Sequence, residues 1–210
     1  DPLLWAGPPI RPDQPRHELR STNIALGIRI VDEMFRGPLN DLLKECIGSE
    51  DWRSIVGRKT SDKRMREEEI ALRYFAFKNE GLKTYRTPLK FWLNDAARNG
   101  RSFTPAQIQS QRASLNSALK KVLTWFDAKE AFRRPESRAI NRALFDLVMR
   151  FADRIPTTEK ASAIKAQFRK RYFALLKAAE FADLISRSVD HTKRTRRRFE
   201  LWQATFDDLI

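Results

Sequence analysis

The residues of this sequence that could do chemistry are mostly cations, and they gather in one short run near the C-terminus. That run contains Lys193, Arg194, Arg196, Arg197 and Arg198. On a helix, Arg194, Arg197 and Arg198 share one side, and Lys193 and Arg196 lie beside it. Clustered guanidinium and ammonium groups bind phosphate oxygens through charge, without reading base identity. The run therefore predicts a surface that binds nucleic acid, with DNA as the expected partner.

Two further basic groups occur in the second half of the chain and could extend the same surface. Their members are Lys165, Arg169, Lys170 and Arg171 in the first group, and Arg133, Arg134 and Arg138 in the second. The first group follows a helical pattern, whereas the second flanks Pro135 in a predicted loop. Because loops often carry binding residues, we include Arg133, Arg134, Lys165 and Arg169 in the candidate nucleic-acid site.

The same arginines have a second interpretation, in which they pair with carboxylates of neighbouring helices. Asp146, Asp153 and Glu180 are acidic positions that such helices would offer. Cations at a helix N-terminus oppose the helix macrodipole by roughly 0.3–1 kcal/mol each, so an anion should compensate them. The sequence does not decide whether that anion is a phosphate or an internal carboxylate.

Catalytic combinations of residues are poor. The three consecutive carboxylates Glu67-Glu68-Glu69 point in different directions on a helix and cannot converge on one metal ion. His17, His191 and Cys46 form no recognisable nucleophile–base set, and a single cysteine forms no internal disulfide. We therefore expect no catalytic residue, no bound metal and no cofactor, and no hydrolase activity of this chain alone.

Composition supports an anionic partner. The 210 residues include 41 Lys and Arg against 27 Asp and Glu, which gives a formal net charge of +14. A surplus of this size favours association with polyanions, of which nucleic acid is the commonest. The sequence contains neither an apolar run of about 18 residues nor a secretory signal pattern. We therefore expect a cytoplasmic protein that makes no contact with a membrane.

The elements that must position these residues are predicted to be helices throughout. Seven glycines, 41% apolar residues, 32% charged residues and the absence of alternating patterns favour an all-α fold. We predict an irregular bundle of about eight or nine helices behind an extended Pro-rich N-terminal arm over residues 1–20. The helical domain would cover 21–210, with 21–100 and 101–210 as possible subdomains.

Periodicity and caps give the approximate bounds of these helices. The predicted ranges are 21–35, 39–47, 50–56, 65–77, 88–99, 105–126, 137–154, 158–177 with a shorter helix or an extension near 181–185, and one from 191 to the end. Thr104 and Gln107 form a predicted capping box. Thr87 is the predicted cap of the helix from Pro88, and Gly48 and Gly57 are predicted to close their helices in a left-handed conformation.

The helix over 65–77 is predicted to be the centre of the fold. Its apolar residues cover more than one side, so it needs partners on two flanks. We expect Leu72 and Phe75 to be nearly fully buried, and we expect Arg73 to face solvent or carboxylate partners. Cys46 falls on an apolar helical face, which indicates a buried, unreactive thiol.

Four ordered blocks resemble the bacterial domain family typified by the GmrSD modification-dependent restriction endonucleases. The blocks are Phe35 to Leu43, Arg64 to Phe77 with Pro88 to Asn94, Ile140 to Phe145, and Arg197 to Trp202. In that family a ParB-like lobe with an Asp-Gly-Gln-Gln-Arg motif, tied to nucleotide hydrolysis, precedes the helices. That motif is missing from this sequence. The chain therefore resembles the helical half of the family without its catalytic half.

The resemblance implies a function in bacterial anti-phage defence. We expect a helical part that binds nucleic acid or serves as a scaffold for a catalytic lobe or partner chain. One alternative is a fragment or subunit of a nucleotide-hydrolysing DNA endonuclease whose catalytic site lies outside this chain. Another is a helical adaptor that binds proteins. The sequence begins without methionine, so we expect it to be a piece of a longer protein.

Overall fold

The computed structural model describes residues 36–57, 66–127 and 129–210. The predicted arm over 1–20, the predicted helix over 21–35 and the first residue of the range 65–77 lie outside these described residues. Within the three ranges every residue belongs to a helix or to a connection between helices, and no strand is present. This confirms the all-α prediction.

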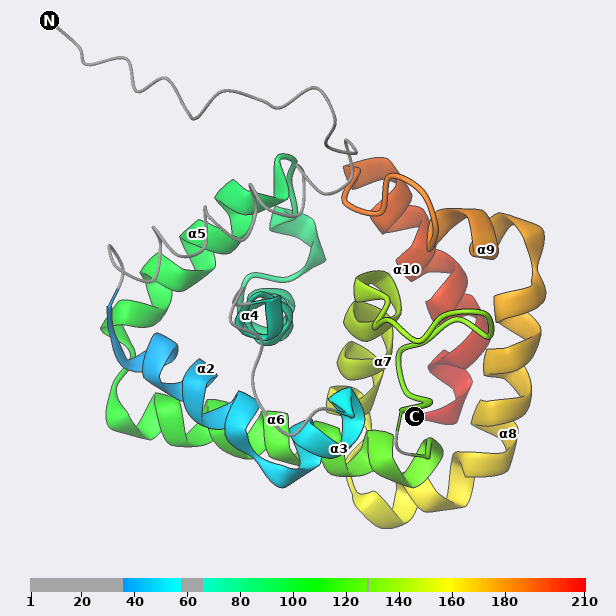
Figure 1. The fold of residues 1–210 in the computed structure, drawn as a ribbon, viewed down its shortest axis with the longest axis horizontal. Helices are drawn as coiled ribbons and strands as arrows, with labels where there is room; N and C mark the ends of the chain where they lie inside the picture. The colour runs from blue at the N-terminus through cyan, green and yellow to red at the C-terminus, as the bar shows by residue number, and fades with distance from the viewer. Residues whose placement is uncertain (1–35, 58–65, 128) are drawn as a thin grey trace, which may run out of the picture.

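Nine α-helices follow one another along the described residues (Figure 1). They are α2 (Pro38–Gly48), α3 (Glu50–Val56), α4 (Arg66–Asn79), α5 (Leu89–Asn99), α6 (Pro105–Trp125), α7 (Arg142–Arg154), α8 (Thr158–Lys177), α9 (Ala179–Leu184) and α10 (Thr192–Phe206). Short 3₁₀ helices follow α4, α5 and α10, at Leu82–Thr84, Gly100–Ser102 and Asp207–Leu209.

Side-chain caps fix several helix starts. At α6, Thr104 Oγ1 accepts a hydrogen bond from the Gln107 N–H at 3.3 Å, and Gln107 Oε1 accepts one from the Thr104 N–H at 2.8 Å. These two bonds confirm the predicted capping box. Asn141 Oδ1 accepts from the Leu144 N–H at 3.0 Å and begins α7, and Thr157 begins α8 in the same way. Such bonds satisfy backbone donors that a helix leaves unpaired in its first turn.

Three helix boundaries differ from the predictions. Gly48 does not close α2 in a left-handed conformation, because Ser49 in extended conformation ends α2 and also caps α3. Thr87 does not cap α5, since Pro88 occupies the cap position in an extended conformation. α7 begins at Arg142 rather than near residue 137, because Asn141 supplies the capping side chain. Gly57 does take the predicted left-handed conformation, with φ of 73°.

α4 is the central helix of one half of the molecule. In Figure 1 it is seen end-on, and α2, α5 and α7, which pack against it, lie around it. The side chains of Leu72 and Phe75 are 3% and 0% exposed, which confirms the predicted burial of both. A helix enclosed on several sides needs apolar residues on most of its surface, and the wide apolar pattern of α4 supplies them.

α6 lies in the second predicted subdomain and also packs against helices of the first. It packs against α2 and α3 from the first part of the chain and against α7 and α8 from the second part. Buried side chains from both parts belong to one continuous hydrophobic core in the described residues. α8, α9 and α10 enclose the other side of that core and carry most of the predicted basic residues (Figure 1).

Candidate nucleic-acid interface

Arg198 lies inside the protein rather than on its surface. The residue is 0% exposed, and its Nη1 donates to the carbonyl oxygens of Val189 at 2.8 Å and Leu184 at 3.4 Å. Its Nη2 donates to Thr195 Oγ1 at 3.3 Å. Burial lowers the pKa of Arg198, and the nearby Asp146 carboxylate opposes that change. In this conformation Arg198 holds the loop before α10 and does not reach a phosphate.

Arg194 and Arg197 pair with carboxylates of α9. Arg194 Nη2 lies 2.6 Å from Asp183 Oδ2, and Arg197 Nε lies 2.7 Å from Glu180 Oε1. The hydrogen bond from Arg197 lowers the pKa of the Glu180 carboxyl. All four side chains keep contact with solvent, and exposed ion pairs of this kind add little to stability. Arg194 and Arg197 therefore pair with carboxylates of a neighbouring helix, and Glu180 is one of the partners that the sequence offered for such pairing.

Lys193 and Arg196 face outward. Both residues are exposed, and neither forms an ion pair or a hydrogen bond with another residue in the described ranges. Their positions three residues apart place them on one side of α10. The run on α10 therefore contains one buried arginine, two arginines paired with α9 and two outward-facing cations.

The α8 group is divided in a similar way. Arg169 donates from Nη1 and Nη2 to the two carboxylate oxygens of Glu130, at 2.8 and 3.0 Å, and from Nη1 to the Trp125 carbonyl oxygen at 2.6 Å. Hydrogen bonding to Arg169 lowers the pKa of Glu130. Lys165, one turn earlier, is exposed and makes no hydrogen bond or ion pair within the described residues.

Arg133 and Arg134 belong to the connection between α6 and α7. Arg133 directs its donors at backbone carbonyls: Nη1 to Ile55 and Nη2 to Val56, both at 3.0 Å, at the end of α3. These bonds satisfy carbonyls that a helix end leaves unpaired. Arg134 Nη1 instead donates to Ser186 Oγ at 2.9 Å, in the loop between α9 and α10. Arg134 keeps further donors for a ligand, because no other hydrogen bond to a described residue uses them.

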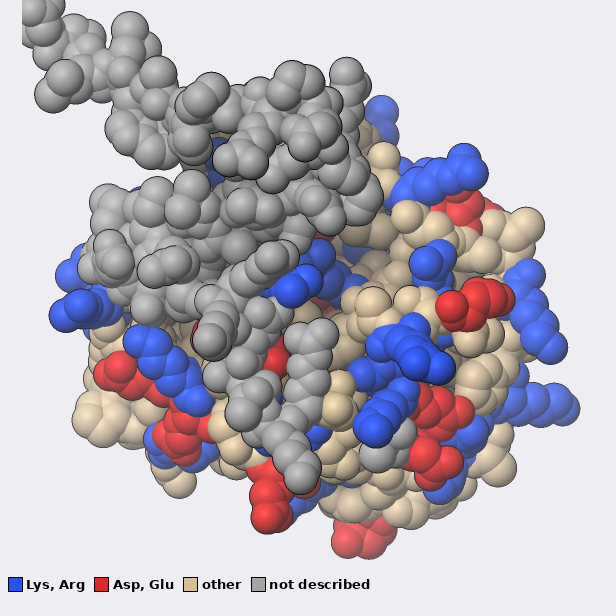
Figure 2. Space-filling view, in the orientation of Figure 1, with Lys and Arg blue, Asp and Glu red and all other residues tan. Residues whose placement is uncertain are grey.

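The three predicted basic groups are neighbours in the fold. Arg169 of α8 binds the α6–α7 connection, Arg134 of that connection binds the α9–α10 loop, and Arg194 of α10 binds α9. Figure 2 shows Lys and Arg side chains over this part of the molecule, with Asp and Glu between them. Arg187 lies in the α9–α10 loop with a side chain that is 84% exposed, and its Nε lies 3.8 Å from Asp183 Oδ1. Sequence analysis missed Arg187 because it stands alone between two serines, outside any basic run.

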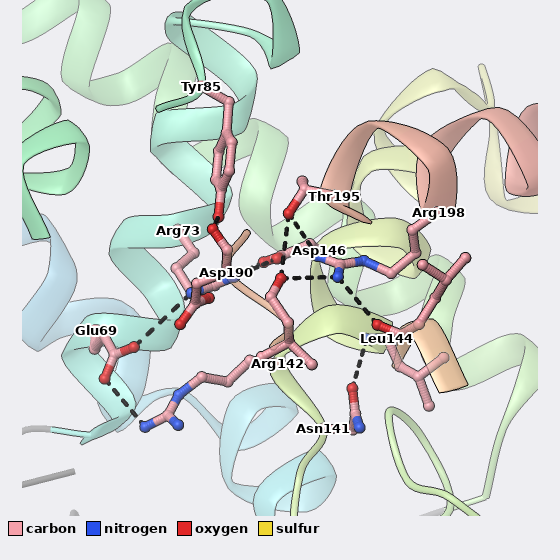
Figure 3. Close-up of polar contacts among 12 residues, drawn as sticks. Glu69, Arg73, Tyr85, Asn141, Arg142, Leu144, Asp146, Asp190, Thr195 and Arg198 are labelled. Carbon is pink, nitrogen blue, oxygen red and sulfur yellow. Dashed lines mark hydrogen bonds and ion pairs between the residues drawn. The ribbon is translucent and has the colours of Figure 1, made fainter. Parts of the chain in front are cut away.

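A group of charged residues surrounds the buried Arg73, as Figure 3 shows. Glu69 and Asp146 are also buried, whereas the side chains of Arg142 and Asp190 are 31% and 36% exposed. Arg73 is 0% exposed, and its Nε and Nη2 donate to Asp146 Oδ1 and Oδ2 at 2.9 and 2.5 Å. Its Nη1 lies 3.3 Å from Asp190 Oδ1 and 4.0 Å from Glu69 Oε1. Glu69 in turn accepts a hydrogen bond from Arg142 at 3.1 Å. We call these five residues the Arg73 cluster.

Asp146 therefore forms its hydrogen bonds and ion pair with Arg73, and it acts on Arg198 of the basic run only through its charge. Burial alone would lower the pKa of Arg73, but the charge and hydrogen bonds of Asp146 outweigh it and hold that pKa well above its ordinary value. A buried pair with two parallel hydrogen bonds is geometrically demanding, and removing one partner leaves an uncompensated charge. The sequence feature that could have indicated this pair is a charged residue inside an apolar run, which occurs once at Arg73 and once at Asp146.

Partly buried hydrogen bonds hold the α9–α10 loop against the Arg73 cluster. Tyr85 Oη donates to the Asp190 carbonyl oxygen at 2.9 Å, and Asn141 Nδ2 donates to the Ile185 carbonyl oxygen at 2.8 Å. Arg198 adds its bond to Val189 between these two points. The loop that carries Arg187 is thus fixed at both ends by groups from the core.

Two further features, a metal-binding group and a membrane-spanning helix, are both missing from the described residues. Within 36–57, 66–127 and 129–210, no group of three or more His, Cys, Asp or Glu residues could hold a metal ion. In the same part of the chain, no helix has the length and apolar character needed to cross a membrane.

Comparison of the chain with models of protein families, with curated proteins and with solved structures finds no match. The resemblance to the GmrSD-type family therefore remains a prediction from the sequence.

Proposed function

We propose that this chain is a helical lobe that binds nucleic acid through phosphate contacts and acts as a scaffold in a bacterial anti-phage defence protein similar to the GmrSD-type family. The observation that carries the proposal is the group of outward-facing cations beside the α9–α10 loop. Its members are Arg187, Lys193 and Arg196, and we call them the outward cations. Arg134 lies beside them through its bond to the same loop.

The net charge supports an anionic partner even though many arginines are paired internally. Each ion pair removes one positive and one negative charge, so internal pairing leaves the surplus of +14 unchanged. Among the outward cations, Lys193 and Arg196 have no carboxylate partner within the described residues, and Arg187 shares Asp183 with Arg194. Contacts of this kind bind the phosphate backbone and do not distinguish sequences.

The residues that carry the family resemblance also support the scaffold part of the proposal. Arg73, Arg142 and Arg198 come from three separate blocks of the resemblance. Arg73 and Arg142 both belong to the Arg73 cluster, and Arg198 binds the loop that this cluster holds (Figure 3). Residues that maintain a shared fold would be expected to meet in this way. The endonuclease-subunit and protein-adaptor functions remain alternative predictions.

The proposal is tested by the affinity of the chain for a fluorescently labelled DNA duplex, measured by anisotropy at low salt. The test variant combines Arg187→Gln, Lys193→Gln and Arg196→Gln. We expect it to bind at least about tenfold more weakly than the parent chain, because it loses phosphate contacts.

A matched control removes the same charge from another surface. It combines Arg86→Gln, Lys90→Gln and Arg98→Gln, which lie on or just before α5 and are exposed. We expect this control to keep most of the parent affinity. Equal weakening in both triple variants would contradict the proposed interface, and absence of duplex binding by the parent would contradict the nucleic-acid function itself.

A further inference from the structure

A cavity of about 170 Å³ lies between the end of α4, the second half of α7 and the middle of α10. Aromatic side chains form much of its wall, namely Phe77, Phe151, Phe199 and Trp202. The rest of the lining consists of two leucines and three polar side chains, namely Leu82, Leu147, Arg150, Arg154 and Gln203. None of the outward cations lines this space, so the cavity is a separate feature of the molecule.

The aromatic wall is fixed by packing. Phe151 and Trp202 are 2% and 3% exposed, and their ring centroids lie 6.3 Å apart. Phe77 and Phe199 pack against each other at 5.2 Å. Because these rings are held by the core, the cavity keeps its shape without a ligand. A cavity of roughly 150 Å³ with an apolar lining accommodates benzene, so this one has room for a single flat ring.

The polar side of the cavity carries positive charge. Arg150 and Arg154 stand one helical turn apart on α7, on the same side of the helix, and their side chains are 40% and 37% exposed. Their carboxylate partners are Asp153 at 3.5 Å and Asp207 at 2.6 Å. Asp153 also binds Lys78 at 2.8 Å. Three cations thus share two carboxylates, and two like charges stand one turn apart, so an anion between the two guanidinium groups would be favourable.

Trp202 lines the cavity, but its indole N–H is not accessible from it. Its indole Nε1 is buried and has no hydrogen-bond partner within the described residues. The cavity therefore combines aromatic walls and a positively charged mouth.

We propose that this cavity binds a small anionic ligand that consists of one flat aromatic ring and one carboxylate or phosphate group. The ring lies between the aromatic walls, and Arg150 and Arg154 hold the anionic group at the mouth. Guanidinium groups suit this role because their planar donors match carboxylate and phosphate oxygens. A free aromatic acid and a pyrimidine nucleotide both have this chemistry, and direct binding measurements separate them.

The first experiment titrates the full chain with four probes and follows binding by protein NMR shifts. The probes are benzoate, phenyl phosphate, cytidine monophosphate and the neutral benzyl alcohol. We expect the simple anionic rings to bind at least about tenfold more tightly than benzyl alcohol, since charge-assisted hydrogen bonds are stronger than neutral ones. Tighter binding of cytidine monophosphate than of benzoate would identify a nucleotide as the ligand, and the reverse order would identify a free aromatic acid.

The second experiment uses single variants of exposed arginines, which should fold normally. Arg150→Gln and Arg154→Gln should each weaken benzoate binding by about five- to tenfold. Arg171→Gln is the matched control, because Arg171 pairs with Asp208 much as Arg154 pairs with Asp207 but does not line the cavity. It should leave benzoate binding unchanged.

Three results would overturn the proposal: no saturable binding of either simple anionic ring, equal affinity for benzoate and benzyl alcohol, or equal weakening by Arg171→Gln and the two cavity variants. The proposal does not depend on duplex binding. The outward-cation variant should retain benzoate binding, and the cavity variants should retain duplex binding, so the two proposals fail independently.

Discussion

At the scale of single residues, two adjacent arginines of α10 have different environments. Arg198 is fully buried against the α9–α10 loop, whereas Arg197 is half exposed and pairs with Glu180. The sequence predicted that both share a side with Arg194, but helical spacing does not say how far each side chain lies from the core. The apolar stripe of Phe199 and Trp202 determines that depth, because it turns the neighbouring Arg198 inward.

Replacement of these two arginines should separate structural from surface roles. Arg198→Gln should lower the free energy of unfolding by about 2–4 kcal/mol, because loop carbonyls that now accept from a charged donor lose it. Arg197→Gln should change that free energy by less than about 1 kcal/mol, as exposed ion pairs do. Urea unfolding followed by circular dichroism measures both, and equal losses would show that the burial of Arg198 has no energetic weight.

The single cysteine provides a second test at this scale. Burial raises the pKa of the Cys46 thiol to about 12, so the folded protein should react very slowly with a thiol-specific disulfide reagent at pH 8. Unfolding in denaturant should release full reactivity. Because the folded-state pKa is raised, the contribution of this thiol to stability is complete below about pH 9 and declines toward pH 12. Rapid reaction of the native chain would contradict the burial of Cys46.

At the scale of helices and connections, the sequence predicted the start of a helix best where a side-chain cap marks it. The capping box of Thr104 and Gln107 gave the start of α6, and Ser49 explains why Gly48 did not act as predicted. The start of α7 was misplaced because the α6–α7 connection contains polar residues compatible with a helix. Arg133, which binds the end of α3 across this connection, could not be assigned from sequence, since that contact depends on tertiary packing.

The central position of α4 makes a direct prediction about stability. Phe75 is 0% exposed in the middle of this helix, so Phe75→Ala should lower the free energy of unfolding by about 3–5 kcal/mol through lost burial and a residual cavity. Phe91→Ala is the control, because the Phe91 side chain on α5 is 50% exposed. Chemical denaturation of both variants measures the difference, and similar small losses would contradict the central role of α4.

At the scale of the whole molecule, charge could be predicted from composition but its distribution could not. The surplus of +14 follows directly from the sequence. Which cations remain available depends on partners far along the chain, such as Glu130 for Arg169 and Asp183 for Arg194. The Arg73 cluster likewise joins residues from α4, α7 and the α9–α10 loop, and no local pattern gives those pairings.

The salt dependence of duplex binding tests the central claim most directly. The logarithm of the dissociation constant should rise linearly with the logarithm of salt concentration for the parent chain, because phosphate contacts release counterions. The Arg187→Gln, Lys193→Gln, Arg196→Gln variant should show a slope that is smaller by up to about one unit per lost contact, while the α5 control keeps the parent slope. A slope unchanged in the outward-cation variant, or affinity insensitive to salt, would contradict the account.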